Sequence, residues 1–164
     1  MDSPPPRANC FDASALVKVF AQEDGSDLVR NYFYNRSPTK YTTPFCFYEA
    51  LSVLKTMWLY RKKLTREQYS DSAFRLTAWF GASTRYTNDI DFKDPVVFSK
   101  VRALVELHSL DLSDAFQILS VKDGYFSGLI NQSQTVLVTA DKSLALAARA
   151  EGVRAWYCLG EPEP

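Results

Sequence analysis

The segment that most constrains the fold of this chain is the run TVLVT at residues 135–139, which is apolar or β-branched throughout and too short for a helix. A strand without polar alternation is covered on both faces, as strands are in a parallel sheet. An alanine-rich helix is expected at Lys142–Ala150, closed by Gly152, and a final strand is expected at Val153–Tyr157. This succession of strand, helix and strand predicts a βαβ unit.

The rest of the chain also alternates between short strand patterns and longer helix patterns. Ala8–Phe11 predicts a first strand that ends in Asp12, with a helix beginning near Ser14. Two more short strands are expected, at Lys40–Thr42 and near Tyr86–Ile90. Two of the other expected helices cover Ser26–Tyr34 and, after the capping pair Thr65 and Gln68, Arg66–Phe80. Three more are expected to begin at Pro44 after the N-cap Thr43, at Pro95 after Asp94, and at a cap on Ser113.

These elements predict a single α/β domain with a mainly parallel sheet over residues 8–160. A disordered Pro-rich tail is expected at residues 1–7, and a frayed end at Glu161–Pro164. The 19 basic and 19 acidic side chains cancel, which excludes a protein that coats nucleic acid through bulk positive charge but not one that binds it locally.

Cysteine and histidine usage argues against a zinc site. Cys10, Cys46 and Cys158 form no CxxC pair, and His108 is the single histidine, so buried reduced thiols are expected instead. No apolar run is long enough to span a membrane, and the first residues contain no hydrophobic signal core. The sequence therefore predicts a cytoplasmic protein without a membrane partner.

Four acidic residues fall where strands give way to helices. Asp12 and Asp141 each follow an expected strand, while Glu49 and Asp114 lie early in expected helices. Ligands of open parallel sheets bind beyond the carboxyl ends of the strands, so these side chains converge if the first strand and the TVLVT strand are neighbours. Helix capping is the more common use of each position taken alone, and Asp12 and Glu49 fit it least because their neighbours are apolar.

Convergence of these carboxylates would require a cation, because the negative charges repel one another. Mg²⁺ and Mn²⁺ prefer oxygen ligands, and phosphodiester hydrolysis is the chemistry most often built on such a site. Motifs for competing chemistries are missing: the sequence contains no GxGxxG, no GxxxxGK[ST] and no GxSxG.

Four segments in this order resemble the PIN-domain nucleases, in particular VapC-like toxin ribonucleases: CFDASALVKVF, FYEALSVL, LDLSDAFQIL and VLVTADKSLALAARAEGVRAW. The resemblance spans Cys10 to Tyr157. It implies a three-layer α/β/α fold with a parallel sheet of about five strands, Mg²⁺ or Mn²⁺ bound by acidic residues, and endonucleolytic cleavage of RNA that leaves a 5′-phosphate. It also implies a homodimer and a cognate antitoxin protein.

The resemblance assigns roles residue by residue. Asp12, Glu49, Asp114 and Asp141 match the acidic residues that hold the metal and carry catalysis in the family. Ser14 matches a hydroxyl residue that would orient Asp12 or hold a metal-bound water, and Thr139 fits a similar supporting role. Asp111, three residues before Asp114, is the alternative for the third acidic position.

The function expected from the sequence is thus a metal-dependent endoribonuclease that serves as the toxin of a toxin–antitoxin pair. Lys18, Lys55 and the basic cluster Arg61–Arg66 are candidate phosphate contacts, and Tyr48 or Tyr60 could stack on a base, although packing is the more common role of a tyrosine. The alternatives are a non-catalytic PIN-fold binding or regulatory module, which the neutral net charge favours, and a phosphatase acting on small phosphoesters.

Overall fold

The structure, a computed structural model, describes residues 7–37, 39–83, 90–127 and 135–164. Its centre is a four-stranded, all-parallel sheet in the order β2-β1-β3-β4. The strands are β1 (Ala8–Phe11), β2 (Thr39–Tyr41), β3 (Thr135–Thr139) and β4 (Arg154–Tyr157). The predicted α/β class with a parallel sheet is confirmed.

The described residues form four strands, where about five are expected. The further strand, expected near Tyr86–Ile90, lies outside the described residues except for Ile90, which is in no strand. Of the expected tail at 1–7, only Arg7 is described.

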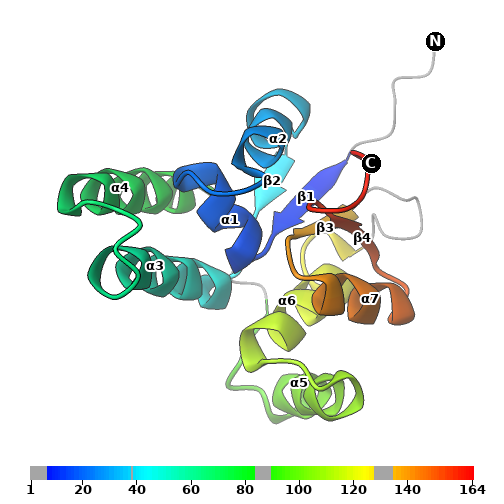
Figure 1. Ribbon diagram of the computed structural model, residues 1–164. Coiled ribbons are helices and arrows are strands. Elements are labelled where there is room, and N and C mark those ends of the chain that lie inside the picture. Colours follow the sequence, from blue (N-terminus) through cyan, green and yellow to red (C-terminus); the bar gives the residue numbers. More distant parts are fainter. Residues whose placement is uncertain (1–6, 38, 84–89, 128–134) are drawn as a thin grey trace.

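Helices cover both faces of the sheet, which makes the three layers of an α/β/α fold (Figure 1). Alternate side chains of a strand point to opposite faces, and the core divides accordingly. Phe11, Val138 and Trp156 pack in one apolar cluster with α1 and α2, whereas Cys10 and Leu137 belong to a second cluster with α6 and α7. The helices are α1 (Ala13–Phe20), α2 (Ser26–Asn31), the π-helical turn η1 (Tyr32–Arg36), α3 (Pro44–Leu59), α4 (Arg66–Ser83), α5 (Pro95–His108), α6 (Leu112–Asp123) and α7 (Lys142–Ala150).

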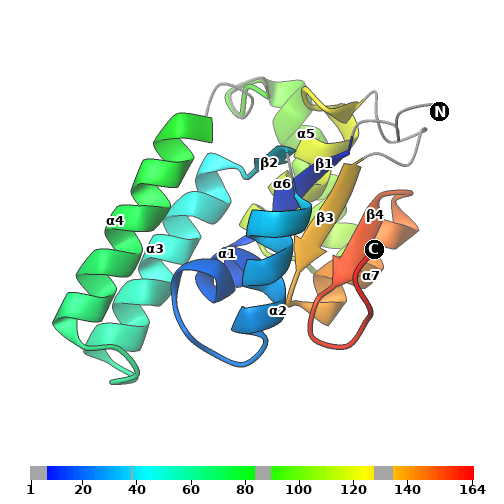
Figure 2. The same cartoon turned by 90° about the horizontal axis from the view of Figure 1, so that it is seen from above.

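Helices α3 and α4 form an antiparallel pair beside this three-layer core (Figure 2). Their starts follow from the predicted caps. The Thr43 hydroxyl accepts from the Cys46 amide at 3.2 Å, with Pro44 in the first turn. Thr65 and Gln68 exchange the two bonds of a capping box, at 2.9 and 3.1 Å.

The expected frayed end at Glu161–Pro164 is wrong at its first residue. The Glu161 carboxylate accepts from Arg149 at 2.5 Å, and its carbonyl accepts from the Trp156 indole at 3.1 Å. The segment is therefore attached to α7 and β4. The three cysteines are free and buried, as predicted. Among the described helices, none has both the length and the apolar character needed to cross a membrane.

Candidate functional site

The candidate site begins at the shared edge where β1 and β3 end. The two strands pair in parallel, and the Asp12 amide extends the ladder by donating to the Val138 carbonyl at 3.1 Å. Asp12 is also the N-cap of α1, because its Oδ1 accepts from the Ala15 amide at 2.8 Å. Its side chain is buried, with a relative exposure of 2%. This burial agrees with the apolar neighbours that the sequence predicts for Asp12.

Two hydroxyl groups hold the Asp12 carboxylate in place. Ser14 Oγ donates to Asp12 at 2.8 Å from Oδ1, and Thr139 Oγ1 donates to Oδ2 at 2.5 Å. The same two oxygens accept from the next turn of backbone, Ser14 Oγ from the Ala140 amide and Thr139 Oγ1 from the Asp141 amide, each at 2.9 Å. The structure thus places both predicted supporting residues against Asp12 and ties them to the segment that carries Asp141.

Glu49 reaches the site from the second turn of α3. Its Oε2 accepts from the Ser113 hydroxyl at 2.6 Å. The sequence predicts Ser113 as the cap of the next helix, and this is wrong: α6 begins at Leu112 with Asp111 as its N-cap. The Ser113 hydroxyl therefore donates across to α3 and does not cap α6.

Asp114 lies in the first turn of α6, and its pKa shows how closely the acidic groups are grouped. The pKa of Asp114 is raised to about 7, first by burial and then by the negative charges of Asp12, Glu49, Asp141 and Asp111. The pKa of Asp12 is raised to about 6, because burial outweighs the hydrogen bonds from Thr139, Ala15 and Ser14, and the Glu49 charge adds to the rise. The four predicted acidic residues therefore act on one another in one place.

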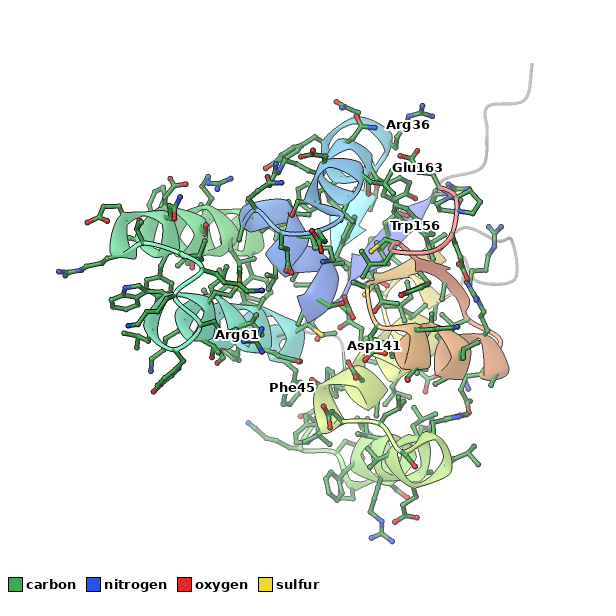
Figure 3. The ribbon with its side chains drawn as sticks, in the orientation of Figure 1. Arg36, Phe45, Arg61, Asp141, Trp156 and Glu163 are labelled. Carbon is green, nitrogen blue, oxygen red and sulfur yellow. The ribbon has the colours of Figure 1, made fainter. Side chains whose placement is uncertain are left out.

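Asp111 and Asp141 have more exposed positions. Asp111 is exposed whereas Asp114 is half-buried beside the other acidic groups, which favours Asp114 as the third acidic residue of the site. Asp141 is exposed and caps α7, where its Oδ1 accepts from the amides of Ser143 and Leu144 at 2.7 and 3.2 Å. Figure 3 shows Asp141 close to α6 and α7.

Sequence reasoning missed Gln117, which joins three of the elements that carry the acidic residues. This buried amide donates to the Phe11 carbonyl at 3.0 Å and to Cys10 Sγ at 2.9 Å, and it accepts from the Thr43 hydroxyl at 2.8 Å. It therefore links the end of β1, the N-cap of α3 and the first half of α6. Its position, three residues after Asp114 on an otherwise apolar helix face, was the available signal, since a buried amide needs partners.

Lys18 does not serve the role that the sequence suggests for it. Its side chain is buried, and Nζ bonds to Glu23 at 3.3 Å and to the Asp24 carbonyl at 2.7 Å. This lysine stabilises the turn after α1 and is not available to phosphate.

The donor set suits a hard divalent cation. The described residues contain no group of three or more His, Cys, Asp or Glu side chains arranged to hold a metal ion, so the carboxylates do not form a ready-made ligand shell. Mg²⁺ commonly binds through only one or two carboxylates and several waters, and it takes oxygen ligands as these residues offer. A cation would also offset the cost of burying these negative charges and their mutual repulsion, the two effects that raise the pKa values of Asp12 and Asp114.

No protein-family model matches the sequence, and no curated protein resembles it significantly in sequence. Among solved structures, the crystal structure of PAE2754 from Pyrobaculum aerophilum, a PIN-domain protein, is similar to this chain. The match has a TM-score of 0.55 and 18% sequence identity, and it covers 91% of this chain and 89% of that chain. The fold is PIN-like. At 18% sequence identity, this similarity shows a shared fold and nothing about function.

Proposed function

We propose that this chain is a divalent-metal-dependent endoribonuclease that acts as the toxin of a toxin–antitoxin pair. The observation that carries the proposal is the grouping of Asp12, Glu49 and Asp141, from three other elements of the fold, around Asp114. Burial raises the pKa of Asp114, and these three charges add to the rise. Perturbed carboxyl groups at the carboxyl ends of parallel strands are typical of a functional site. RNA, a homodimeric state and an inhibiting antitoxin follow from the resemblance to VapC-like proteins.

In this proposal Asp12, Glu49, Asp114 and Asp141 would hold Mg²⁺ or Mn²⁺. The ion would supply Lewis acidity, which lowers the pKa of a water molecule and offsets charge on the phosphate. Ser14 and Thr139 orient the Asp12 carboxylate, and Ser113 orients that of Glu49. Such hydrogen bonds to acidic ligands fix their rotamers before the substrate arrives.

A non-catalytic PIN-fold binding module is the second candidate. The capping bonds of Asp12 and Asp141 favour it, because helix initiation alone explains a carboxylate at either position.

Cleavage assays with a matched pair of aspartate variants separate the two candidates. We expect total RNA and purified tRNA to be cut at discrete sites with Mg²⁺ or Mn²⁺ and not with EDTA. Asp114→Asn is expected to lower the cleavage rate by a factor on the order of 10² or more, because it removes a charge from the cation site. Asp111→Asn makes the same replacement of a carboxylate by an amide three residues away, at an exposed position, and this variant should keep most of the activity. RNA left intact by the folded wild-type chain with either metal would favour the binding module.

The hydroxyl of Ser113 gives a subtler prediction. Ser113→Ala removes the bond to Glu49 and is expected to weaken Mg²⁺ binding about tenfold, since loss of a group that orients a metal ligand commonly costs 10- to 100-fold. Titration calorimetry with Mg²⁺ measures this directly. Ser120→Ala is the control, because that hydroxyl lies on the same helix but bonds only to the Phe116 carbonyl. Equal affinities of the two variants would contradict a role of Ser113 in the site.

A further inference from the structure

Basic residues are segregated along one stretch of this chain, whose net charge is zero. Between Glu49 and Glu67 the sequence contains five basic residues and no acidic one. The five are Lys55 on α3, Arg61, Lys62 and Lys63 in the loop that follows, and Arg66 at the start of α4. All five are exposed.

These cations also differ from most others in their partners. Seven other lysine and arginine side chains in the described residues form ion pairs with acidic ones, as in Lys100 with Asp123 at 2.8 Å and Arg102 with Glu106 at 3.0 Å. Within the described part of the chain, none of the five basic residues between Glu49 and Glu67 forms an ion pair. Their charge is therefore uncompensated and attracts a polyanion.

Two tyrosines lie along the same stretch, and both face solvent. Tyr48 is 63% exposed and directly precedes Glu49, while Tyr60 is 74% exposed at the end of α3. Packing is the more common role of tyrosine, but the core side of α3 is formed by other residues: Cys46, Phe47, Ala50, Leu54 and Met57. The structure leaves both tyrosine rings open for contact with a ligand.

The helix brings the first three of these groups into one stripe that starts at the candidate site. Tyr48, Ser52 and Lys55 are spaced four and three residues apart, which places them on one exposed stripe. Tyr60, the C-cap of α3, is twelve residues from Tyr48, or about 18 Å along the helix axis and about a third of a turn around it, next to the basic loop. Figure 2 shows α3 running from its start beside β2 to the loop that joins it to α4.

We propose that the α3 face, which consists of Tyr48, Ser52, Lys55 and Tyr60 with the loop residues Arg61–Lys63, binds single-stranded RNA and leads it to Glu49. This inference rests on the proposed ribonuclease function. Alternating aromatic rings and free cations are how proteins hold a single strand, with bases stacked on the rings and phosphates on the cations. A duplex does not fit this surface, because its bases are already paired and stacked.

Binding can be measured apart from cleavage, on the full chain in EDTA, by fluorescence anisotropy with a labelled unstructured RNA of about 12 nucleotides. Tyr48→Ala is expected to raise the Kd by about fivefold or more, the loss that removal of one stacked base produces. Tyr34→Ala is a close control, because Tyr34 is 55% exposed and likewise contacts the preceding phenylalanine ring, but it lies on η1. An equal Kd for the two variants would overturn the proposal.

Salt dependence tests the phosphate contacts independently. Lys55→Ala should lower the slope of log Kd against log salt by about 0.7, as expected for one phosphate contact with a single strand. Arg36→Ala removes an exposed cation at the end of η1, distant from Asp141 in Figure 3, and should leave the slope unchanged. Identical slopes for both variants would contradict a phosphate contact at Lys55 and so overturn the proposed path of the RNA along α3.

The two proposals fail in different ways. If RNA is cut but Tyr48→Ala and Lys55→Ala bind it as the wild type does, the ribonuclease stands and the α3 face is wrong. If both variants weaken RNA binding but no metal supports cleavage, the α3 face stands and the chain is a binding module. A duplex that binds as tightly as the single strand would also overturn the α3 face.

Discussion

Asp12→Asn is expected to lower metal-dependent RNA cleavage by a factor on the order of 10³ while the protein stays folded. Asparagine keeps the size of the side chain, and its Oδ1 can still accept from the Ala15 amide that starts α1. It has no negative charge to hold a divalent cation. Because burial raises the pKa of Asp12 to about 6, the ionised carboxylate present at pH 7 lowers the stability of the metal-free folded state relative to the unfolded chain, so the variant should be at least as stable as the metal-free wild type.

The matched control for this substitution is Asp94→Asn. Asp94 is also an N-cap aspartate, whose Oδ1 accepts from the Val96 amide at 2.8 Å, but it is exposed and starts α5. Cleavage rates and urea unfolding curves should be measured for both variants in parallel. Loss of activity in both, or a folded Asp12→Asn variant that cuts RNA as fast as the wild type, would contradict a catalytic role of Asp12.

Stability of the metal-free protein is expected to fall as the pH rises from 5 to 8. The carboxyl groups of Asp12 and Asp114 have pKa values of about 6 and about 7 in the folded chain, against 3.8 ordinarily, so the folded state binds more protons than the unfolded state in this range. The stabilisation of the folded state by these extra protons is fully present below about pH 4, and it is lost as the pH rises through the two folded-state pKa values. For buried Asp12 alone, the shift corresponds to about 3 kcal/mol of unfolding free energy.

Other shifted carboxyl groups do not obscure this window. The pKa of Glu151 is lowered by hydrogen bonds from His108 and Lys122, and that of Glu161 by Arg149, so both groups are ionised in either state above pH 5. Urea unfolding at pH 5 and pH 8 in EDTA measures the decrease, and the same pair of measurements with Mg²⁺ should show a smaller one, because the cation binds the ionised carboxylates. Stability that rises with pH in EDTA would contradict the grouping of charges described above.

Local signals were sufficient for most of the fold. Helix starts at Pro44, Arg66 and Pro95 follow from caps that lie within three residues of the helix they start, so the sequence alone contains both partners of each bond. The unbroken apolar character of Thr135–Thr139 predicts a strand buried on both faces, and every residue of β3 is buried. The pairing of β1 with β3, on which convergence of Asp12 and Asp141 depends, was a conditional expectation that the sheet order confirms.

Contacts between distant segments were beyond sequence reasoning. Ser113 has the residue type of a helix cap, but its bonding partner Glu49 is 64 positions away and is not visible from local spacing. Gln117 bonds to Phe11 across 106 positions for the same reason. The sequence suggests Lys18 as a phosphate contact only because it is basic. Its burial depends on how the turn after α1 folds back, which the sequence does not reveal. Side-chain partners of this kind follow only from the assembled fold.

The central position of β1 determines when the candidate site can exist. The Thr139 hydroxyl that holds Asp12 lies 127 positions later in the sequence, on the strand that pairs with β1. Because β3 is synthesised after β1 and after the helices between them, Asp12 and Asp141 stay apart until β3 has been made. Any chemistry that depends on both residues can therefore begin only once β3 has paired with β1.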